Sequence, residues 1–344
     1  MSLMLQEIAE QPAALARTIG EERAKIERLA ASLRQRDLDL IVLVARGSSD
    51  NAALFGRYLL EITTGIPVSL SAPSVHTLYQ AKLDLKRALV IGVSQSGAGE
   101  DINRVLENAR QCGAFTIGIT NEPESPMVSL VDETLLMHGG RERSVAATKT
   151  FTGQMILFYM LSAALARDNR VLDYQSIPDF VARALEQKPA IVELVQRYVF
   201  MENCVVVGRG LAYANAYEFA LKLMETSYVV AERFSSADFL HGPVAMIERH
   251  FPVFLFAPAG VMLKGTKDLI ARLHELRADT LAITGDLDAA AKSTRSIIMP
   301  REIDEFLAPI PYIIPAQLFA ALLAEAKGLD PDAPRSLSKV TRTL

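Results

Sequence analysis

Short apolar segments alternate with helical segments along most of this 344-residue chain. A charged helical pattern covers residues 3–36, and the first two apolar segments after it are LDLIVLVA (38–45) and ALVIGV (88–93). AFTIGIT (114–120) and ETLLM (133–137) continue the series, with helical spacing of the apolar residues between them. Short, nearly continuous apolar strands between helices are typical of a parallel sheet covered on both faces. The pattern therefore predicts an α/β fold.

The second half of the chain repeats the strand ends of the first half. ARG (45–47) recurs as GRG (208–210), and LVIGVSQSG (89–97) recurs as PVFLFAPAG (252–260), both at an offset of 163 residues. A third pair, GITN and AITG, recurs at an offset of 164. Strand ends that recur at one offset indicate two copies of one α/β unit.

We divide the chain into five parts on this basis, since its length suits two domains. The expected parts are an N-terminal helical segment at 1–37, a first α/β domain at 38–170, a linking helix at 171–200, a second α/β domain at 201–330, and a C-terminal tail at 331–344.

The segment SQSGAGED, Ser94 to Asp101, connects the strand ALVIGV to a helical pattern. Small residues at such a junction are often only a turn and a helix cap. The alternative is a cradle for an anion, since N–H groups at a helix N-terminus lack partners and the helix dipole favours negative charge. Gly97 and Gly99 would let the backbone approach the anion. Because the second copy forms this turn as APAG, without hydroxyl groups, Ser94 and Ser96 favour the cradle.

Ser48 and Ser49 follow the first predicted strand directly. Ligands of open α/β sheets bind at the carboxyl ends of the strands, so we expect both serines at the same sheet edge as Ser94. The net charge of −4 and the pI of about 5.8 give no reason to expect nucleic acid as a partner. Local hydrogen-bond donors can nevertheless bind a small anion.

The predicted helix YEFALKLMETSY (217–228) carries three charged residues among apolar ones. Glu218, Lys222 and Glu225 are four and three positions apart, which places them on adjoining parts of one face. Such a group is often a solvated ion pair of little energetic value. Because apolar residues surround it on most sides, a position in a cleft or interface is also open, where Glu225 could act as a general base beside Lys222.

Spacing alone assigns no role to His241, in the loop FLHGP, or to Lys339, in the polar tail PRSLSKVTRTL. Cys112 and Cys204 form neither a disulfide framework nor a zinc pattern, and none of the five histidines has HxxxH or HExxH spacing, so we expect no metal. The N-terminus lacks the features of a signal peptide, and no apolar run reaches the roughly 18 residues that span a bilayer. We therefore expect a cytoplasmic protein without a membrane partner.

Six stretches together resemble the sugar isomerase (SIS) superfamily, and within it the isomerase half of glucosamine-6-phosphate synthase, over about residues 38–344. The resemblance implies two tandem SIS domains of flavodoxin-like, three-layer α/β/α type, with no cofactor. The stretches are RGSS (46–49), SQSG (94–97), VAATKTF (145–151), EFALKLMETSY (218–228), AERFSSADFLHGP (231–243) and DPDAPRSLSKVT (330–341).

The resemblance also implies a substrate, a sugar phosphate, and the residues that bind it. Ser49, Ser94, Gln95 and Ser96 match the positions that hold the phosphate. The complete expected set of substrate-binding residues is Ser48, Ser49, Ser94, Gln95, Ser96, Gly97, Gly99 and Val145.

The catalytic residues that the resemblance implies are Glu225, Lys222, His241 and Lys339. Glu225 matches the base that moves a proton between carbons 1 and 2 of the sugar, and Lys222 matches its neighbour. His241 matches the residue that opens the sugar ring and that comes from the partner subunit, which implies a homodimer. Lys339 matches the lysine that forms a Schiff base with the open-chain ketose, which implies that the tail at 331–344 closes the active site.

Several positions depart from the synthase pattern. The synthase has an N-terminal glutaminase domain with a cysteine nucleophile at residue 2, whereas residues 1–37 are too short for such a domain and carry Ser2. Ala98 and Gly99 replace a glutamate and a threonine, so one phosphate-binding hydroxyl is missing. Ala147 replaces a serine.

We therefore expect an amino-sugar-phosphate deaminase that converts glucosamine 6-phosphate and water to fructose 6-phosphate and ammonia. The alternatives are a deglycase for a 6-phosphorylated fructosamine, an ammonia-dependent, synthase-like aminotransferase, and a non-catalytic sugar-phosphate sensor. Sensors of this superfamily usually carry a DNA-binding domain, for which residues 1–37 are too short. The four catalytic matches favour an enzyme, because a sensor needs only the cradle.

Overall fold

The computed structural model describes residues 2–166 and 172–339. Residues 340–344, the end of the predicted tail, lie outside the described residues, as do 167–171 at the predicted border between the first domain and the linking helix. The chain divides into two compact units. Unit 1 comprises residues 1–12, 143–148 and 176–336, and unit 2 comprises residues 13–142, 149–175 and 337–344.

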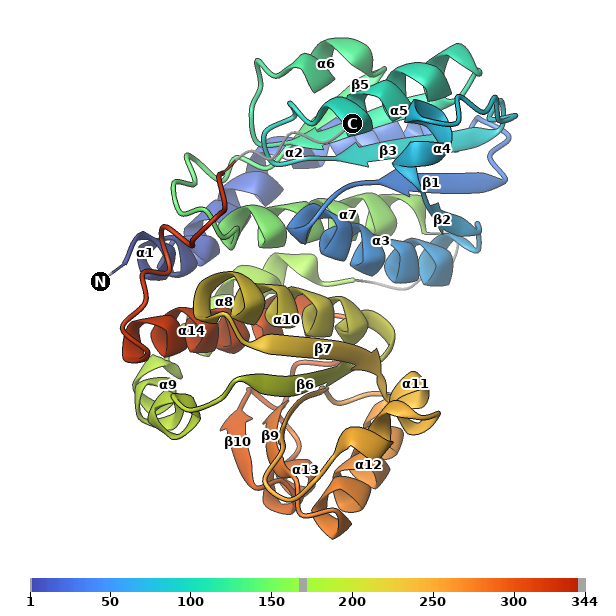
Figure 1. The fold of residues 1–344 in the computed structure, drawn as a ribbon. Helices are drawn as coiled ribbons and strands as arrows, with labels where there is room; N and C mark the ends of the chain where they lie inside the picture. Colours follow the sequence, from blue (N-terminus) through green and yellow to red (C-terminus); the bar gives the residue numbers. More distant parts are fainter. Residues whose placement is uncertain (1, 167–171, 340–344) are drawn as a thin grey trace. The chain divides into compact units, whose positions relative to one another are not determined.

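Unit 2 is built on a five-stranded sheet whose strands are all parallel (Figure 1). The strand order is β2-β1-β3-β4-β5. The central strand β3 is buried along its whole length, as its continuous apolar sequence predicts. The strands are β1 (Leu40–Val44), β2 (Val68–Leu70), β3 (Ala88–Val93), β4 (Phe115–Thr120) and β5 (Glu133–Leu136).

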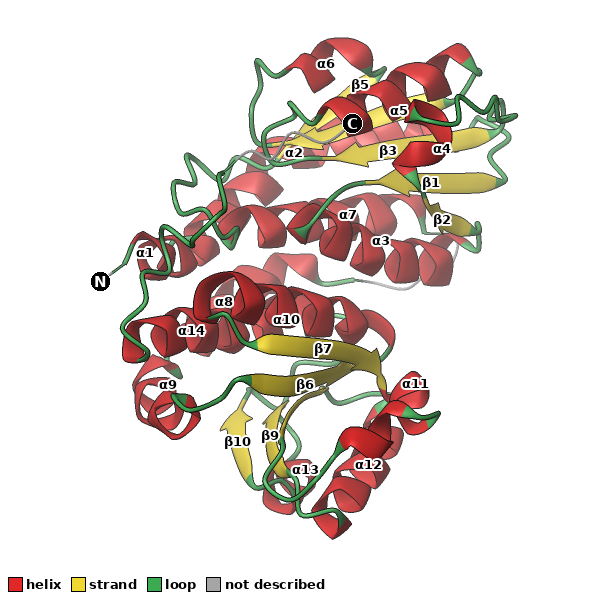
Figure 2. Ribbon diagram, in the orientation of Figure 1, coloured by secondary structure: helices red, strands yellow, loops and turns green. Residues whose placement is uncertain are grey.

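Helices cover both faces of this sheet (Figure 2). One face carries α4 (Pro73–Thr77), α5 (Glu100–Gln111) and α6 (Pro126–Leu130), and the other carries α3 (Ser48–Thr64) and α7 (Lys149–Leu165). The helix α2 (Gln11–Leu33) is bonded to the segment after β5, where the Thr18 hydroxyl donates to the Met137 carbonyl.

Close packing joins α3 to α7. The rings of Phe55 and Tyr159 lie 4.9 Å apart. Gly56 permits this contact, because a Cβ atom there would come within 2.7 Å of the Phe158 ring. Both helices are buried along most of their length, so the apolar sequence of α7 is that of a core helix.

Unit 1 repeats the architecture of unit 2. Its parallel sheet has the order β10-β9-β8-β6-β7. Read from β7, this order matches that of unit 2 strand for strand, which confirms the duplication predicted from the recurring strand ends. The strands are β6 (Asn203–Gly208), β7 (Val230–Ser235), β8 (Pro252–Ala257), β9 (Asp279–Thr284) and β10 (Arg295–Ile298).

The helices of unit 1 also form two layers (Figure 2). The first consists of α8 (Ile177–Leu185), α10 (Tyr213–Ser227) and α14 (Pro309–Ala326), with α9 (Lys188–Val195) and α1 (Leu3–Ala9) packed on α14. The second consists of α11 (Ser236–Leu240), α12 (Leu263–Glu275) and α13 (Leu287–Lys292). Single-turn 3₁₀ helices lie at η1 (Tyr174–Ser176), η2 (Gln196–Tyr198), η3 (Gly210–Ala212) and η4 (Pro243–Met246).

The core of unit 1 centres on α14. The rings of Phe219, Phe254 and Phe319 stack edge to face at centroid distances of 5.2 to 5.7 Å. Within the described part of the chain, α14 is the one helix long and apolar enough to cross a bilayer, but 89% of it is buried inside the structure. Its apolar sequence is therefore accounted for by core packing.

Candidate active site

The predicted cradle lies in unit 2, between the end of β3 and the start of α5. Ser94 is 7% exposed, and its hydroxyl accepts the N–H of Gly97 at 3.1 Å. The Ser96 hydroxyl accepts the N–H of Ala98 at 3.3 Å. Gly97 has a φ of +59°, and a Cβ atom there would lie 2.1 Å from the Ser125 hydroxyl oxygen, so both the backbone and the packing require glycine.

Hydrogen bonds join this turn to the end of the neighbouring strand β4. The Gln95 carbonyl accepts the N–H of Asn121 at 3.1 Å and the hydroxyl of Thr120 at 3.3 Å. Gly99 precedes α5, whose first turn carries Glu100 and Asp101. In that first turn the N–H of Ile102 donates to the Asp101 carboxylate at 2.8 Å. The Ser94 and Ser96 hydroxyls lie in the turn just before α5, and hydroxyls at a helix N-terminus suit an anion.

Ser48 and Ser49 begin α3, directly after β1. The register of the parallel strands β1 and β3 pairs Val44 with Gly92, so both strands end at the same edge of the sheet, as predicted. Ser49 is 8% exposed, and its hydroxyl accepts the side-chain amide N–H of Gln154 at 2.9 Å. Unit 2 thus brings the serines after β1 and those after β3 to one edge of the sheet.

Arg46 reaches the same edge and was not among the predicted site residues. Its Nε lies 2.7 Å from the carboxylate of Asp101 in the first turn of α5. The Asp101 side chain is 2% exposed, whereas that of Arg46 is 51% exposed. The buried carboxylate therefore holds the guanidinium beside the start of α5. Arg46 is the first residue of RGSS, but the second copy also has an arginine at the matching position, Arg209, so the sequence alone indicates only a repeated feature.

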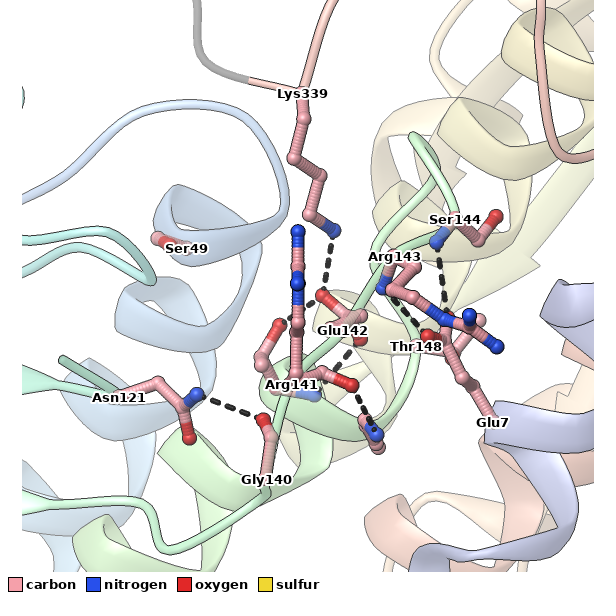
Figure 3. Close-up of polar contacts among 12 residues, drawn as sticks. Glu7, Ser49, Asn121, Gly140, Arg141, Glu142, Arg143, Ser144, Thr148 and Lys339 are labelled. Carbon is pink, nitrogen blue, oxygen red and sulfur yellow. Dashed lines mark hydrogen bonds and ion pairs between the residues drawn. The ribbon is translucent and has the colours of Figure 1, made fainter.

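Lys339 belongs to unit 2, where its side chain meets a buried carboxylate (Figure 3). Its Nζ donates to Glu142 Oε2 at 2.8 Å. The Glu142 side chain has no exposed surface, and that of Lys339 is 24% exposed. No local pattern in the sequence marks Glu142, because the contact joins positions 197 residues apart.

The charged group predicted on residues 217–228 lies in unit 1 on α10, largely inside the protein. Lys222 is fully buried, and its Nζ lies 2.6 Å from Glu225 Oε2 and 3.4 Å from Glu218 Oε1. Glu218 is also fully buried, whereas the side chain of Glu225 is 22% exposed. The exposed-ion-pair alternative is therefore wrong, and Glu225 is the member of the group that a ligand can reach.

His241 lies in unit 1 at the end of α11, on an exposed loop. Its backbone N–H donates to the Asp238 carbonyl at 3.1 Å, and its side chain has no partner among the described residues. The neighbouring Leu240 and Met246 are also exposed, at 50% and 42%. The imidazole is thus free to contact another molecule.

Val145 lies on the loop 143–148 of unit 1. Its N–H donates to the Asp332 carbonyl at 3.3 Å. The carboxylate of Glu7 holds the start of this loop, since it accepts the N–H groups of Arg143 at 2.5 Å and Ser144 at 3.3 Å (Figure 3). The backbone around Val145 is therefore fixed from both sides.

The second copy of the cradle, APAG in unit 1, is occupied by the protein itself. A Cβ atom on Gly260 would lie 2.3 Å from Glu305 Oε2, and the same oxygen accepts the N–H of Met262 at 3.4 Å. A carboxylate thus lies where the first copy would take an anion. Unit 1 therefore offers no open cradle at this position.

The predicted site residues are divided between the two units. Unit 2 holds the serines, Gln95, the glycines and Lys339, and unit 1 holds Val145, Lys222, Glu225 and His241. Among residues 2–166 and 172–339, no group of three or more His, Cys, Asp or Glu side chains could hold a metal ion. The roles of the individual residues stay predictions.

Comparison with family models gives one match that covers most of the chain. The model described as "SIS domain" matches residues 32–164 and again residues 201–325. The two matches correspond to the sheets of unit 2 and unit 1, in that order.

Similar proteins extend the match to nearly the whole chain. A glutamine–fructose-6-phosphate aminotransferase (isomerizing) of Gloeobacter violaceus is 36% identical over 98% of this chain, but this covers only 58% of that protein. The C-terminal domain of the glucosamine-fructose-6-phosphate aminotransferase of Francisella tularensis has a TM-score of 0.89 at 28% identity, covering 97% of this chain and 98% of that one. A glucosamine-6-phosphate deaminase of Thermotoga maritima shares the fold at 22% identity and a TM-score of 0.76, covering 99% of this chain and 100% of that one.

Proposed function

The chain belongs to the SIS-domain family, and from this premise we propose that it is an amino-sugar-phosphate deaminase that acts on glucosamine 6-phosphate. The products would be fructose 6-phosphate and ammonia. The observation that carries the proposal is the group on α10. Glu225 is a partly exposed carboxylate that is paired with the buried amine of Lys222 at 2.6 Å.

The cradle of unit 2 would bind the 6-phosphate. The hydroxyls of Ser49, Ser94 and Ser96 and the N–H groups at the start of α5 supply donors suited to a phosphate. This end of the substrate does not react, so its binding energy serves to orient the reacting carbons.

Glu225 would move the proton between carbons 1 and 2 of the open-chain sugar. A general base needs a carboxylate that is ionised and within reach of the proton. The Glu225 carboxylate is paired with the ammonium of Lys222 at 2.6 Å, and its exposed part makes it accessible. Transfer of the proton from carbon 2 to carbon 1 turns the amino aldose into a ketose imine, which water hydrolyses to the ketose and ammonia.

His241 would open the sugar ring, and Lys339 would form an imine with the ketose. The exposed loop and free imidazole of His241 fit the expectation that this residue serves the site of a partner subunit in a homodimer. The cytoplasmic location likewise stays a prediction.

Release of ammonia tests the proposal directly. Purified protein is incubated with the 6-phosphates of glucosamine, galactosamine and mannosamine, and ammonia is measured without added glutamine. Release from glucosamine 6-phosphate is expected, at least about a hundredfold faster than with the Glu225→Gln variant. If none of the amino-sugar 6-phosphates releases ammonia and a 6-phosphorylated fructosamine is cleaved, the protein is a deglycase and the proposal is wrong.

A second candidate is ammonia-dependent synthesis in the opposite direction. Relatives named as aminotransferases support this candidate. The chain matches 57–58% of their length, so we propose free ammonium as the nitrogen source. Fructose 6-phosphate with ammonium would then yield glucosamine 6-phosphate. Tight binding of sugar phosphates without turnover in either direction would instead indicate a sensor.

A further inference from the structure

A buried carboxylate in unit 2 is bonded to the amine that the proposed reaction uses. Glu142 Oε2 accepts a hydrogen bond from Lys339 Nζ at 2.8 Å (Figure 3). Thr150, in the first turn of α7, donates to the same carboxylate twice, from its N–H to Oε1 at 3.2 Å and from its hydroxyl to Oε2 at 2.7 Å. Three donors therefore surround a side chain that water does not reach.

This arrangement stabilises the charge of Glu142. A buried carboxylate is costly unless it is paired and hydrogen-bonded. The N-terminus of α7 also favours a negative charge, because the N–H groups of its first turn lack intrahelical acceptors. Two cationic residues flank this segment, Arg141 and Lys149, and Lys149 Nζ donates to the Arg141 carbonyl at 2.8 Å.

Lys339 and Glu142 differ in solvent exposure, and this difference decides which of them a ligand can reach. The side chain of Lys339 is 24% exposed, so a sugar carbonyl can approach its nitrogen. That of Glu142 has no exposed surface, so it meets a ligand only after Lys339 has moved or reacted.

We propose that Glu142 positions Lys339 and takes and returns its proton while the lysine forms an imine with the open-chain sugar. The inference rests on the proposed function. It assigns Glu142 to the proton transfers of imine formation, for which the proposed function names no residue. Glu142 contacts the reacting nitrogen directly, since its Oε2 lies 2.8 Å from Lys339 Nζ.

Protons and charges balance in the formation of the imine. The Lys339 ammonium gives one proton to Glu142, and the free amine attacks the carbonyl carbon, which forms the C–N bond and leaves a negative charge on oxygen. A proton then passes from nitrogen to that oxygen and gives a neutral carbinolamine. Glu142 returns its proton to the hydroxyl group, water leaves, and the nitrogen lone pair forms the C=N bond of a protonated imine. Glu142 is again a carboxylate, and one water is released.

Reductive trapping measures this step without the rest of the reaction. Fructose 6-phosphate is added with cyanoborohydride, and the reduced adduct on the C-terminal peptide is followed by mass spectrometry between about pH 6.5 and 8.5. Glu142→Gln keeps the shape and loses the base, so the adduct is expected to form at least about tenfold more slowly. Because its lysine must lose the proton to water, the rate should rise with pH more steeply than in the wild type.

Controls separate the proton transfer from a structural role. Thr150→Val removes one hydrogen bond but keeps the carboxylate, and it should keep the pH profile of the wild type. Lys339→Arg should give no adduct at the C-terminal peptide. Glu142→Ala opens space for a small carboxylate, and formate should restore adduct formation in a saturable manner. Binding of glucitol 6-phosphate, measured by calorimetry, should stay near the wild-type value in Glu142→Gln.

Three results would overturn the inference. One is a wild-type rate and pH profile in Glu142→Gln. Another is a slow Glu142→Ala variant that binds glucitol 6-phosphate normally and does not respond to formate. The third is the absence of any adduct on Lys339 in the wild type. Ammonia release from the same preparation reports separately on the proposed function, so the two failures are distinguishable.

Discussion

At the scale of single residues, the buried charges decide which side chains can act. Lys222 and Glu218 are fully buried, and the ammonium of Lys222 is paired with both Glu218 and Glu225. Removing one partner of a buried pair commonly costs about 3–5 kcal/mol, because the remaining charge stays buried without a counterion. Lys222 is therefore part of the stability of α10 as well as the partner of Glu225.

Arg46 should contribute to phosphate binding, because Asp101 holds its guanidinium beside the first turn of α5. One charge-assisted hydrogen bond is worth about 1.5–3 kcal/mol, so Arg46→Ala should weaken calorimetric binding of a sugar phosphate about 10- to 100-fold. Arg57→Ala is the matched control, since Arg57 lies on α3 in an exposed pair with Glu61. Unchanged affinity in Arg46→Ala would show that Arg46 only neutralises Asp101.

At the scale of elements, the two copies of the cradle explain why one unit should bind phosphate. β3 is followed by hydroxyl groups and an open turn, whereas β8 is followed by APAG and the carboxylate of Glu305. The same strand–turn–helix element is thus used once for a ligand and once for an internal contact.

Ser94→Ala with Ser96→Ala should therefore weaken sugar-phosphate binding and raise KM, by about 1.5–3 kcal/mol for each bond lost to the charged phosphate. Glu305→Gln is the matched control in the duplicate cradle and should leave the affinity unchanged. Calorimetry should give one site per chain in both the wild type and the control. A loss of affinity in Glu305→Gln equal to that of the double variant would contradict the assignment of the cradle to unit 2.

The pattern of apolar residues was sufficient to predict the sheets, because parallel strands buried on both faces need continuous apolar sequence. The strands expected at 88–93 and 133–137 are found at Ala88–Val93 and Glu133–Leu136. The contact between Glu142 and Lys339 could not be predicted from periodicity, since it joins two irregular segments far apart in the chain. The side-chain contact of Arg46 with Asp101 likewise depends on tertiary structure.

At the scale of the whole molecule, the exposed loop of His241 bears on assembly. Its imidazole has no partner among the described residues, and Leu240 and Met246 beside it expose apolar surface. A surface with exposed apolar side chains beside the His241 imidazole suits an interface with a second copy of the chain.

If His241 completes the site of a partner subunit, two inactive variants should restore each other. Mixed dimers of His241→Ala and Glu225→Gln contain one site with both residues intact. After subunit exchange of equal amounts, roughly a quarter of the sites should be active, from statistical pairing in a symmetric dimer. Absence of recovered activity, with mixed dimers verified by native mass spectrometry, would place both residues in the same chain's site.

The central claim is that Glu225 transfers a proton between carbons 1 and 2 of a 6-phosphorylated sugar. Exchange of the carbon-bound hydrogen with solvent tests it most directly. Fructose 6-phosphate is incubated with the protein in D₂O, and deuterium at carbon 1 is followed by NMR. The wild type should incorporate deuterium, and Glu225→Gln should do so at least about a hundredfold more slowly while binding the sugar phosphate normally. Exchange at the wild-type rate in Glu225→Gln would contradict the account.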